Sequence, residues 1–257
     1  MAEGPTTHDA FIGGRLRLSQ PAAGHRAGTD AVLLAAAVPA NVTGLAIDVG
    51  AGVGAAGLIV ALATPKLRLT LVEREPHLAA LARANVKFNH LDDRVFVGEA
   101  DLLCSDFHHA AGLEREAADL VLTNPPFLSA ATARISPNRD KASAHVIGAG
   151  GLDAWVHACL ALLRPGGTFL IIHRADALAD ILQALSPRAG AHIILPIHAR
   201  ADRPATRILI RALKGRRTRL VLAPPLVLHN SDGTFTIFAE TLHRGEARID
   251  WDELSRP

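Results

Sequence analysis

The chain has 257 residues, of which 49% are hydrophobic and 20% are charged, and its formal net charge is +2. This balance is typical of a globular protein with a sizeable core, and it excludes a disordered or strongly basic chain. No apolar run approaches the roughly 20 residues that a membrane-spanning helix needs, and the N-terminus lacks the basic and apolar segments of a secretion signal. We therefore expect a cytoplasmic protein that makes no membrane contact.

Strand and helix patterns alternate from residue 44 onward. Apolar runs that predict strands lie at 44–50, 66–73, 93–100, 118–124 and 167–174. Helical patterns fall between them, at 54–63, from Pro76 onward and at 152–164. Pro76 suits the first turn of a helix, because the N–H that proline lacks would have no partner there. Alternating strands and helices predict a parallel sheet with helices on both faces.

The C-terminal third follows a different pattern. The runs 191–199 and 206–213 are joined by a short linker, so they predict an antiparallel hairpin. Together with the five earlier strands they predict an α/β fold with a mostly parallel seven-stranded sheet that ends in this C-terminal hairpin. We divide the chain into an N-terminal approach segment (1–43), a central domain (44–215) and a strand-and-turn extension packed on the same domain (216–257).

A glycine-rich loop follows the first predicted strand. Glycines at such a place let the backbone turn tightly and approach a ligand closely. The run from Gly52 to Gly57 fits the dinucleotide pattern G-x-G-x-x-G. Glu73 follows about 20 residues later, where that pattern expects an acidic residue. A nicotinamide-dependent oxidoreductase is therefore one interpretation of the loop.

The other interpretation uses the whole stretch "DVGAGVG" (48–54), which resembles the first motif of S-adenosylmethionine-dependent methyltransferases. In that fold, the acidic Asp48 near the loop suits the ammonium group of the cofactor. Glu73 would accept hydrogen bonds from the ribose hydroxyls, and Asp101 would accept one from the adenine amine. All three acids follow predicted strands, and the carboxyl edge of an open α/β sheet is where ligands bind.

The fourth predicted strand ends at "NPPF" (124–127). Two adjacent prolines cannot continue a helix or a central strand, so the chain leaves the sheet stiffly. The motif matches a pattern, [N/D/S]-P-P-[Y/F/W], of methyltransferases that act on a planar nitrogen. The Asn124 side-chain oxygen and the Pro125 carbonyl would accept both N–H bonds of an amine, and Phe127 would stack on a base. The expected catalytic residues are Asn124, Pro125, Pro126 and Phe127. The expected cofactor-binding residues are Asp48, Gly50, Gly52, Gly54, Glu73, Asp101 and Asn124, and we expect no metal.

Beyond these motifs, the chain resembles the bacterial tRNA(Val) adenine N(6)-methyltransferase family. Further matching segments are "GHRAGTDAVLLAA" (24–36), "LLRPGGTFLIIHRADALADIL" (162–182), "RADRPATRILIRALKG" (200–215) and "LAPPLVLHNSDGTFT" (222–236). The resemblance implies a Rossmann-like class I methyltransferase fold, S-adenosylmethionine as cofactor, and methyl transfer to adenine N(6) in tRNA near the anticodon. It also implies that the approach segment covers the cofactor site. Phe127 stands where many relatives have Tyr.

The substrate is less closely specified than the chemistry. The same motif serves enzymes that methylate a glutamine amide in peptide-release factors, so a protein substrate is the alternative to RNA. A basic cluster at 211–220 favours RNA because its cations could neutralise phosphates. Its members are Arg211, Lys214, Arg216, Arg217 and Arg219. The loop 128–145 holds further cations that could do the same, and we expect a monomer or a homodimer.

Two further residue types bear on the site. Cys104 and Cys159 are too few for a disulfide framework or a metal cage, so we expect free, buried thiols. Trp155 lies on the apolar face of its predicted helix, and we expect it in the core.

Overall fold

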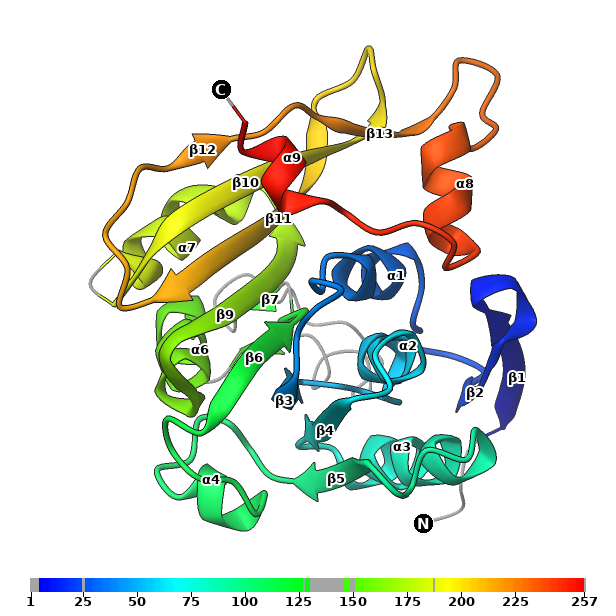
Figure 1. The fold of residues 1–257 in the computed structure, drawn as a ribbon. Helices are drawn as coiled ribbons and strands as arrows, with labels where there is room; N and C mark the ends of the chain where they lie inside the picture. The colour runs from blue at the N-terminus through cyan, green and yellow to red at the C-terminus, as the bar shows by residue number, and fades with distance from the viewer. Residues whose placement is uncertain are drawn as a thin grey trace.

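A computed structural model describes residues 5–24, 26–126, 128–129, 146–147, 151–186 and 188–256 (Figure 1). Within these residues, nine strands form the central sheet. Five of them are parallel and lie in the spatial order β5-β4-β3-β6-β9. Their bounds are β3 (Gly44–Val49), β4 (Leu67–Glu73), β5 (Val95–Glu99), β6 (Ala118–Thr123) and β9 (Leu163–Arg174). These are the five strands that the apolar runs predict.

The two remaining long strands of the sheet form the predicted hairpin. It consists of β10 (Ala189–Arg200) and β11 (Ala205–Lys214). The second strand, β11, lies between β9 and β10 and is antiparallel to both. Two short strands, β12 (Val221–Leu222) and β13 (Leu226–His229), then pair with β10. The predicted fold class is confirmed, and these two strands of the tail raise the sheet from the seven predicted strands to nine.

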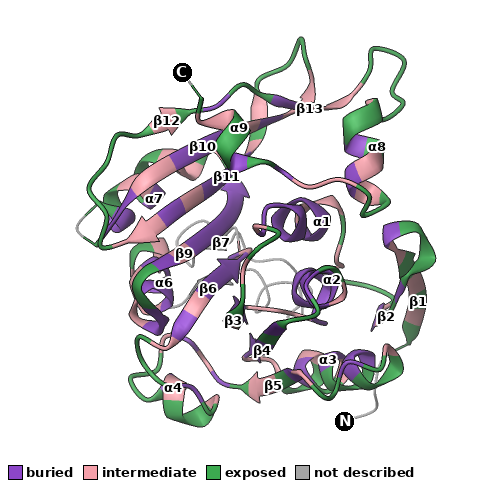
Figure 2. Cartoon of the chain, viewed as in Figure 1, coloured by how far each residue is buried: buried purple, intermediate pink, exposed green. Residues whose placement is uncertain are grey.

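Helices cover both faces of the sheet. One face carries α1 (Thr29–Ala36), α2 (Ala55–Ala63) and α3 (Pro76–Phe88), and the other carries α6 (Gly151–Leu162) and α7 (Leu178–Leu185). Side chains alternate between the two cores along each strand, so that Leu120 and Leu122 pack on the first face and Val121 on the second. The central strands β3, β4, β6 and β9 are accordingly buried along most of their length (Figure 2). Burial on both faces explains why they are continuous apolar runs.

Shorter elements connect and flank these layers. They are η1 (Ile12–Gly14), α4 (Phe107–Ala110), β7 (Leu128–Ser129), β8 (Val146–Ile147), η2 (Ala175–Ala177), α8 (Ile237–His243) and α9 (Trp251–Leu254). Within the described part of the chain, no helix is long and apolar enough to cross a membrane.

Three local predictions need correction. The helix predicted at 152–164 ends at Leu162, because Leu163 already pairs with Ala118 in the sheet. The N-terminal segment holds an unpredicted hairpin of β1 (Thr6–Phe11) and β2 (Leu16–Pro21). The tail holds helices as well as strands and turns, and α8 begins where the Thr236 side chain accepts a hydrogen bond from the Ala239 N–H.

Both chain ends pack against the central layers. In β2, the Ser19 N–H donates to the Asn85 side chain of α3 at 2.7 Å. Near the C-terminus, the Trp251 indole donates to the Ala37 carbonyl at 2.6 Å. The two ends also meet each other, since Arg15 donates to the carbonyls of Arg244 and Gly245. The division at residues 43 and 215 remains a prediction.

Candidate active site

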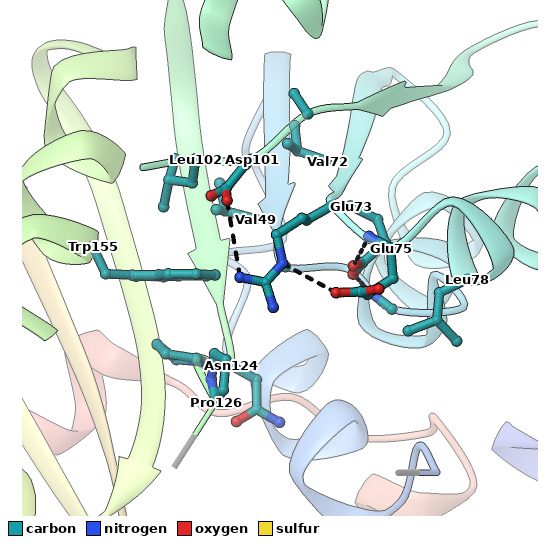
Figure 3. A pocket seen from close by; sticks show the side chains of 15 residues that line it. Val49, Val72, Glu73, Glu75, Leu78, Asp101, Leu102, Asn124, Pro126 and Trp155 are labelled. Carbon is teal, nitrogen blue, oxygen red and sulfur yellow. Dashed lines mark hydrogen bonds and ion pairs between the residues drawn. The ribbon is translucent and has the colours of Figure 1, made fainter. Parts of the chain in front are cut away.

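A cavity opens at the carboxyl edge of the parallel strands, where β3, β4 and β6 end side by side (Figure 3). It therefore lies at the edge where open α/β sheets bind ligands. Its lining consists of Val49, Gly50, Gly52, Val72, Glu73, Arg74, Glu75, Leu78, Ala100, Asp101, Leu102, Asn124, Pro125, Pro126 and Trp155. Seven residues of the predicted site are among them. The exceptions are Asp48 and Gly54, which lie behind the lining, and Phe127, which lies outside the described residues.

The glycine turn (50–54) forms one wall of the cavity. Gly50, Gly52 and Gly54 all adopt positive φ, at 71°, 58° and 89°, a backbone region that side chains with a Cβ rarely enter. The N–H groups of Gly50 and Ala51 both donate to the Val72 carbonyl, at 2.9 and 3.0 Å, so the turn folds back over the end of β4. The alternating glycines of the motif are thus required by the backbone path.

Glu73 holds this turn in place. One carboxylate oxygen accepts the Gly52 N–H at 2.7 Å, and the other accepts the Glu75 N–H at 2.8 Å. The side chain is nearly buried but still lines the cavity. Glu73 therefore joins the glycine turn to the end of β4 and presents a carboxylate to any ligand bound there.

Asp48, in β3, bonds to the start of α2, the helix that follows the glycine turn. It is 2% exposed, and its carboxylate accepts the Gly57 N–H at 2.8 Å, in the first turn of α2. Burial raises the pKa of Asp48 to about 7, the Gly57 hydrogen bond opposes this rise, and the charge of Glu73 adds to it. The geometry gives Asp48 a structural contact with the first turn of α2, and its predicted contact with a cofactor remains a prediction.

The raised pKa predicts a pH-dependent stability change in Asp48→Asn. An unfolded Asp loses its proton near pH 3.8, whereas folded Asp48 keeps it until about pH 7. Between these values ionisation favours the unfolded chain, so the wild type loses stability as pH rises. Asn cannot ionise, so the variant should gain relative stability across this window, reaching on the order of 4 kcal/mol above pH 7. Urea unfolding of both proteins from pH 4 to 8 measures this difference, and a difference that does not change with pH would contradict it.

Charged side chains form the wall opposite the NPP segment (124–126). Asp101 accepts the Leu103 N–H at 3.0 Å through one carboxylate oxygen. Its other oxygen lies 3.9 Å from the guanidinium of Arg74, which also contacts Glu75 at 3.2 Å. Sequence reasoning missed Arg74 and Glu75 as lining residues, although their place directly after Glu73 at a strand end was a usable signal.

The NPP segment forms the remaining wall. β6 ends at Thr123, and Asn124, Pro125 and Pro126 follow along the cavity (Figure 3). The Asn124 side-chain oxygen is buried, and among the described residues it has no hydrogen-bond partner. Buried carbonyl oxygens are nearly always paired, so an unpaired one on a residue that lines the cavity points to a site prepared for a donor.

Trp155 is a core residue, as predicted, but it also lines the cavity. Its indole N–H donates to the Thr123 hydroxyl at 3.0 Å. A Cβ added to Gly50 would lie 2.9 Å from the indole Cζ2, closer than real contacts allow. Helical periodicity places Trp155 inside the protein, but it cannot show which buried face borders a ligand cavity.

Two glycines of the turn should therefore respond differently to substitution by Ala. Gly50→Ala combines a left-handed backbone with the contact to Trp155, so we expect a loss of roughly 2–4 kcal/mol of stability. A Cβ at Gly52 meets no described atom within 4 Å, so Gly52→Ala should lose only about 1–2 kcal/mol from backbone strain. Chemical denaturation of the pair measures the difference, and equal losses would show that Trp155 does not restrict Gly50.

The basic cluster at 211–220 lies at the opposite edge of the sheet. Because β11 is antiparallel to β9, its end at Lys214 lies beside the start of the parallel strands. Lys214 there bonds to Glu116 at 2.8 Å and to the Leu163 carbonyl at 2.6 Å. The cluster is thus not beside the cavity. The cations of the loop 128–145 lie outside the described residues.

Among the described residues, the cysteines and the histidines add no metal site. Cys159 is free and buried, which raises its thiol pKa, whereas Cys104 is exposed, so the expectation of two buried thiols was wrong for Cys104. It lies in the loop after β5, where no apolar pattern requires burial. In the described ranges, no group of three or more His, Cys, Asp or Glu side chains could hold a metal ion.

Comparison with known proteins identifies the family. The sequence matches the methyltransferase small domain family over residues 26–182, which is more than half of the chain. The chain belongs to this family. The match decides between the two interpretations of the glycine turn, because it leaves the nicotinamide alternative without support. The protein is an S-adenosylmethionine-dependent methyltransferase.

Curated relatives match most of the methyltransferase. A tRNA1(Val) (adenine(37)-N6)-methyltransferase of Porphyromonas gingivalis is 27% identical over 235 residues, which cover 89% of this chain and 91% of the relative. A protein of the same name from Yersinia enterocolitica is 30% identical over 188 residues, or 72% of each chain. The resemblance noted from the sequence is therefore confirmed.

Solved structures agree on the fold of the methyltransferase. A predicted O-methyltransferase from Agrobacterium tumefaciens superposes with a TM-score of 0.72 at 32% identity, covering 86% of this chain and 98% of that one. A SAM-dependent O-methyltransferase from Thermotoga maritima gives a TM-score of 0.52 at 18% identity, which shows the shared fold.

Proposed function

We propose that this methyltransferase methylates the exocyclic N(6) amine of an adenine in tRNA, near the anticodon. The observation that carries the proposal is the Asn124 side-chain oxygen, which is buried without a partner among the described residues and belongs to a residue that lines the cavity. An exocyclic amine offers the N–H donors that such an acceptor needs. The names of the curated relatives support adenine in tRNA as the acceptor.

The residues around the cavity suit S-adenosylmethionine. The open space beside Gly52 would receive the cofactor close to the backbone. Glu73 would accept the ribose hydroxyls through lone pairs that its two backbone donors leave free. Asp101 would accept the adenine amine through the oxygen that faces Arg74. Asp48 would act beneath the turn, through its bond to Gly57.

The chemistry follows from these placements. When bound, S-adenosylmethionine supplies a sulfonium methyl that the attacking nitrogen takes as the carbon–sulfur bond breaks with its electron pair on sulfur. Asn124 and the Pro125 carbonyl would accept the two N–H bonds and favour the more tetrahedral, more nucleophilic nitrogen. The prolines hold these acceptors in position before the reaction. The methylated nitrogen then loses a proton to water, so no strong general base is needed.

The same residues favour nitrogen over oxygen as the acceptor atom. A hydroxyl must give up its proton during attack, and neither the Asn124 amide nor the Pro125 carbonyl can take one. An amine needs only acceptors, because it can lose its proton after the methyl has been transferred. The O-methyltransferase in the name of the Agrobacterium structure describes that protein.

Unmodified tRNA and a glutamine-containing release-factor peptide, each offered with labelled S-adenosylmethionine, distinguish the two substrate classes. We expect the label in tRNA. Because tRNA is a cytoplasmic substrate, we also propose a cytoplasmic enzyme. Label in the peptide alone would replace the RNA proposal with a glutamine-amide methyltransferase.

A further inference from the structure

A buried hydroxyl links the ends of two neighbouring strands at the cavity. Thr123 is the last residue of β6 and directly precedes the NPP segment, and its side chain is 0% exposed. Its hydroxyl donates to the Val49 carbonyl at 2.8 Å. Val49 is the last residue of β3 and directly precedes the glycine turn. The bond therefore connects the strand that ends in the glycine turn to the strand that ends in Asn124.

This bond lies where the pairing of β3 and β6 ends. Val49 and Thr123 are partners in the register of the parallel sheet, and they form the last pair between β3 and β6. Beyond them the glycine turn and the NPP segment leave the ladder. The Thr123 hydroxyl is thus the last direct link between the two strands before their chains diverge.

Trp155, on helix α6, contacts the same hydroxyl. Its indole N–H donates to the Thr123 hydroxyl at 3.0 Å. A hydroxyl can donate one hydrogen bond and accept others, so this threonine serves both partners at once. The indole ring also stands against Gly50, where it leaves no room for a Cβ. Three elements, β3, β6 and α6, therefore meet at one hydroxyl.

We propose that Thr123 and Trp155 are positioning residues that fix the separation between the glycine turn and Asn124. The inference rests on the proposed role of Asn124 as the acceptor of the substrate amine. The glycine turn would hold the methyl donor and the NPP segment the methyl acceptor, so their separation sets the distance between the reacting atoms. A misplacement of about 1 Å in such a geometry can cost about 100-fold in rate.

The test compares Thr123→Val with Thr123→Ser. Val keeps the branched shape and breaks both hydrogen bonds, whereas Ser keeps the hydroxyl and loses only a methyl group. With saturating S-adenosylmethionine and unmodified tRNA, Thr123→Val should react about 10- to 100-fold more slowly in a single turnover, with little change in Kd for the cofactor. Thr123→Ser should react at nearly the wild-type rate. Equal rates for wild type and Thr123→Val, or equal losses in Val and Ser, would overturn the proposal.

Amide hydrogen exchange separates this inference from the proposed substrate. In Thr123→Val, peptides covering 48–54 and 121–126 should both exchange faster than in the wild type, and Thr123→Ser should restore their protection. Unchanged exchange in Thr123→Val would overturn the positioning role, whatever the acceptor is. A wild type that leaves tRNA unmethylated would instead remove the proposed function, and exchange would then decide the positioning role.

Discussion

Replacing Asn124 by Ala is expected to slow methyl transfer by about 100- to 1,000-fold while leaving cofactor binding nearly intact. The side-chain oxygen is buried without a partner among the described residues, and Asn124 lines the cavity, so we propose that this oxygen accepts a hydrogen bond from the substrate amine. Loss of one preorganised group that stabilises a transition state typically costs about 100- to 1,000-fold in kcat. Single-turnover methyl transfer measures the loss, and calorimetry measures the Kd for S-adenosylmethionine.

Asn41→Ala is the matched control for this change. Asn41 is exposed and precedes β3, so it lies at the opposite edge of the sheet from the cavity. The Asn41→Ala variant should transfer the methyl group at the wild-type rate. An Asn124→Ala variant that keeps full kcat would show that the amide does not hold the amine, and a parallel loss of cofactor binding would assign Asn124 to the cofactor instead.

Replacing Glu73 by Ala is expected to weaken S-adenosylmethionine binding by about 100-fold or more. Hydrogen bonds to a charged group contribute about 1.5–3 kcal/mol each, and Glu73 is proposed to accept two from the ribose. It also secures the turn through the N–H groups of Gly52 and Glu75. Glu73→Gln should rescue little, because the Gly52 and Glu75 N–H groups approach different carboxylate oxygens, so one of them would face the NH2 group of Gln.

Glu99→Gln makes the same chemical change one strand away. Glu99 is the register partner of Glu73 on β5, but it is exposed, pairs with Arg83 at 3.3 Å and lies outside the described lining of the cavity. Calorimetry should find that Glu99→Gln binds S-adenosylmethionine with the wild-type Kd. If Glu73→Gln binds S-adenosylmethionine as tightly as Glu99→Gln does, the carboxylate does not hold the ribose.

Much of the fold could be predicted because the strands are buried on both faces. Continuous apolar runs marked β3, β4 and β6, and Pro76 marked the first residue of α3. The hairpin β1–β2 was harder to predict because only one face of it is buried, and residues 16, 18 and 20 carry that face in a short polar segment. The end of α6 was misplaced because helical periodicity continues to residue 164, whereas pairing with β6 decides where the strand starts.

The candidate site could be predicted where strand ends carry its residues. Gly52, Glu73, Asp101 and Asn124 each follow or end a parallel strand, so one topological rule brings them to the same edge. The rule does not apply to the basic cluster, because β11 is antiparallel to β9 and therefore ends, at Lys214, at the opposite edge of the sheet. Side-chain contacts, such as the bond from Trp155 to Thr123, have no signature in spacing.

The central claim is that this methyltransferase modifies the exocyclic amine of an adenine in tRNA. The most direct test is nucleoside analysis of unmodified tRNA after reaction with wild-type enzyme and labelled S-adenosylmethionine. We predict that the label appears in N(6)-methyladenosine and is lost with Asn124→Ala. Label on a ribose oxygen, on another base or only on protein would contradict the account, because the acceptors at Asn124 and Pro125 would then have been assigned to the wrong group.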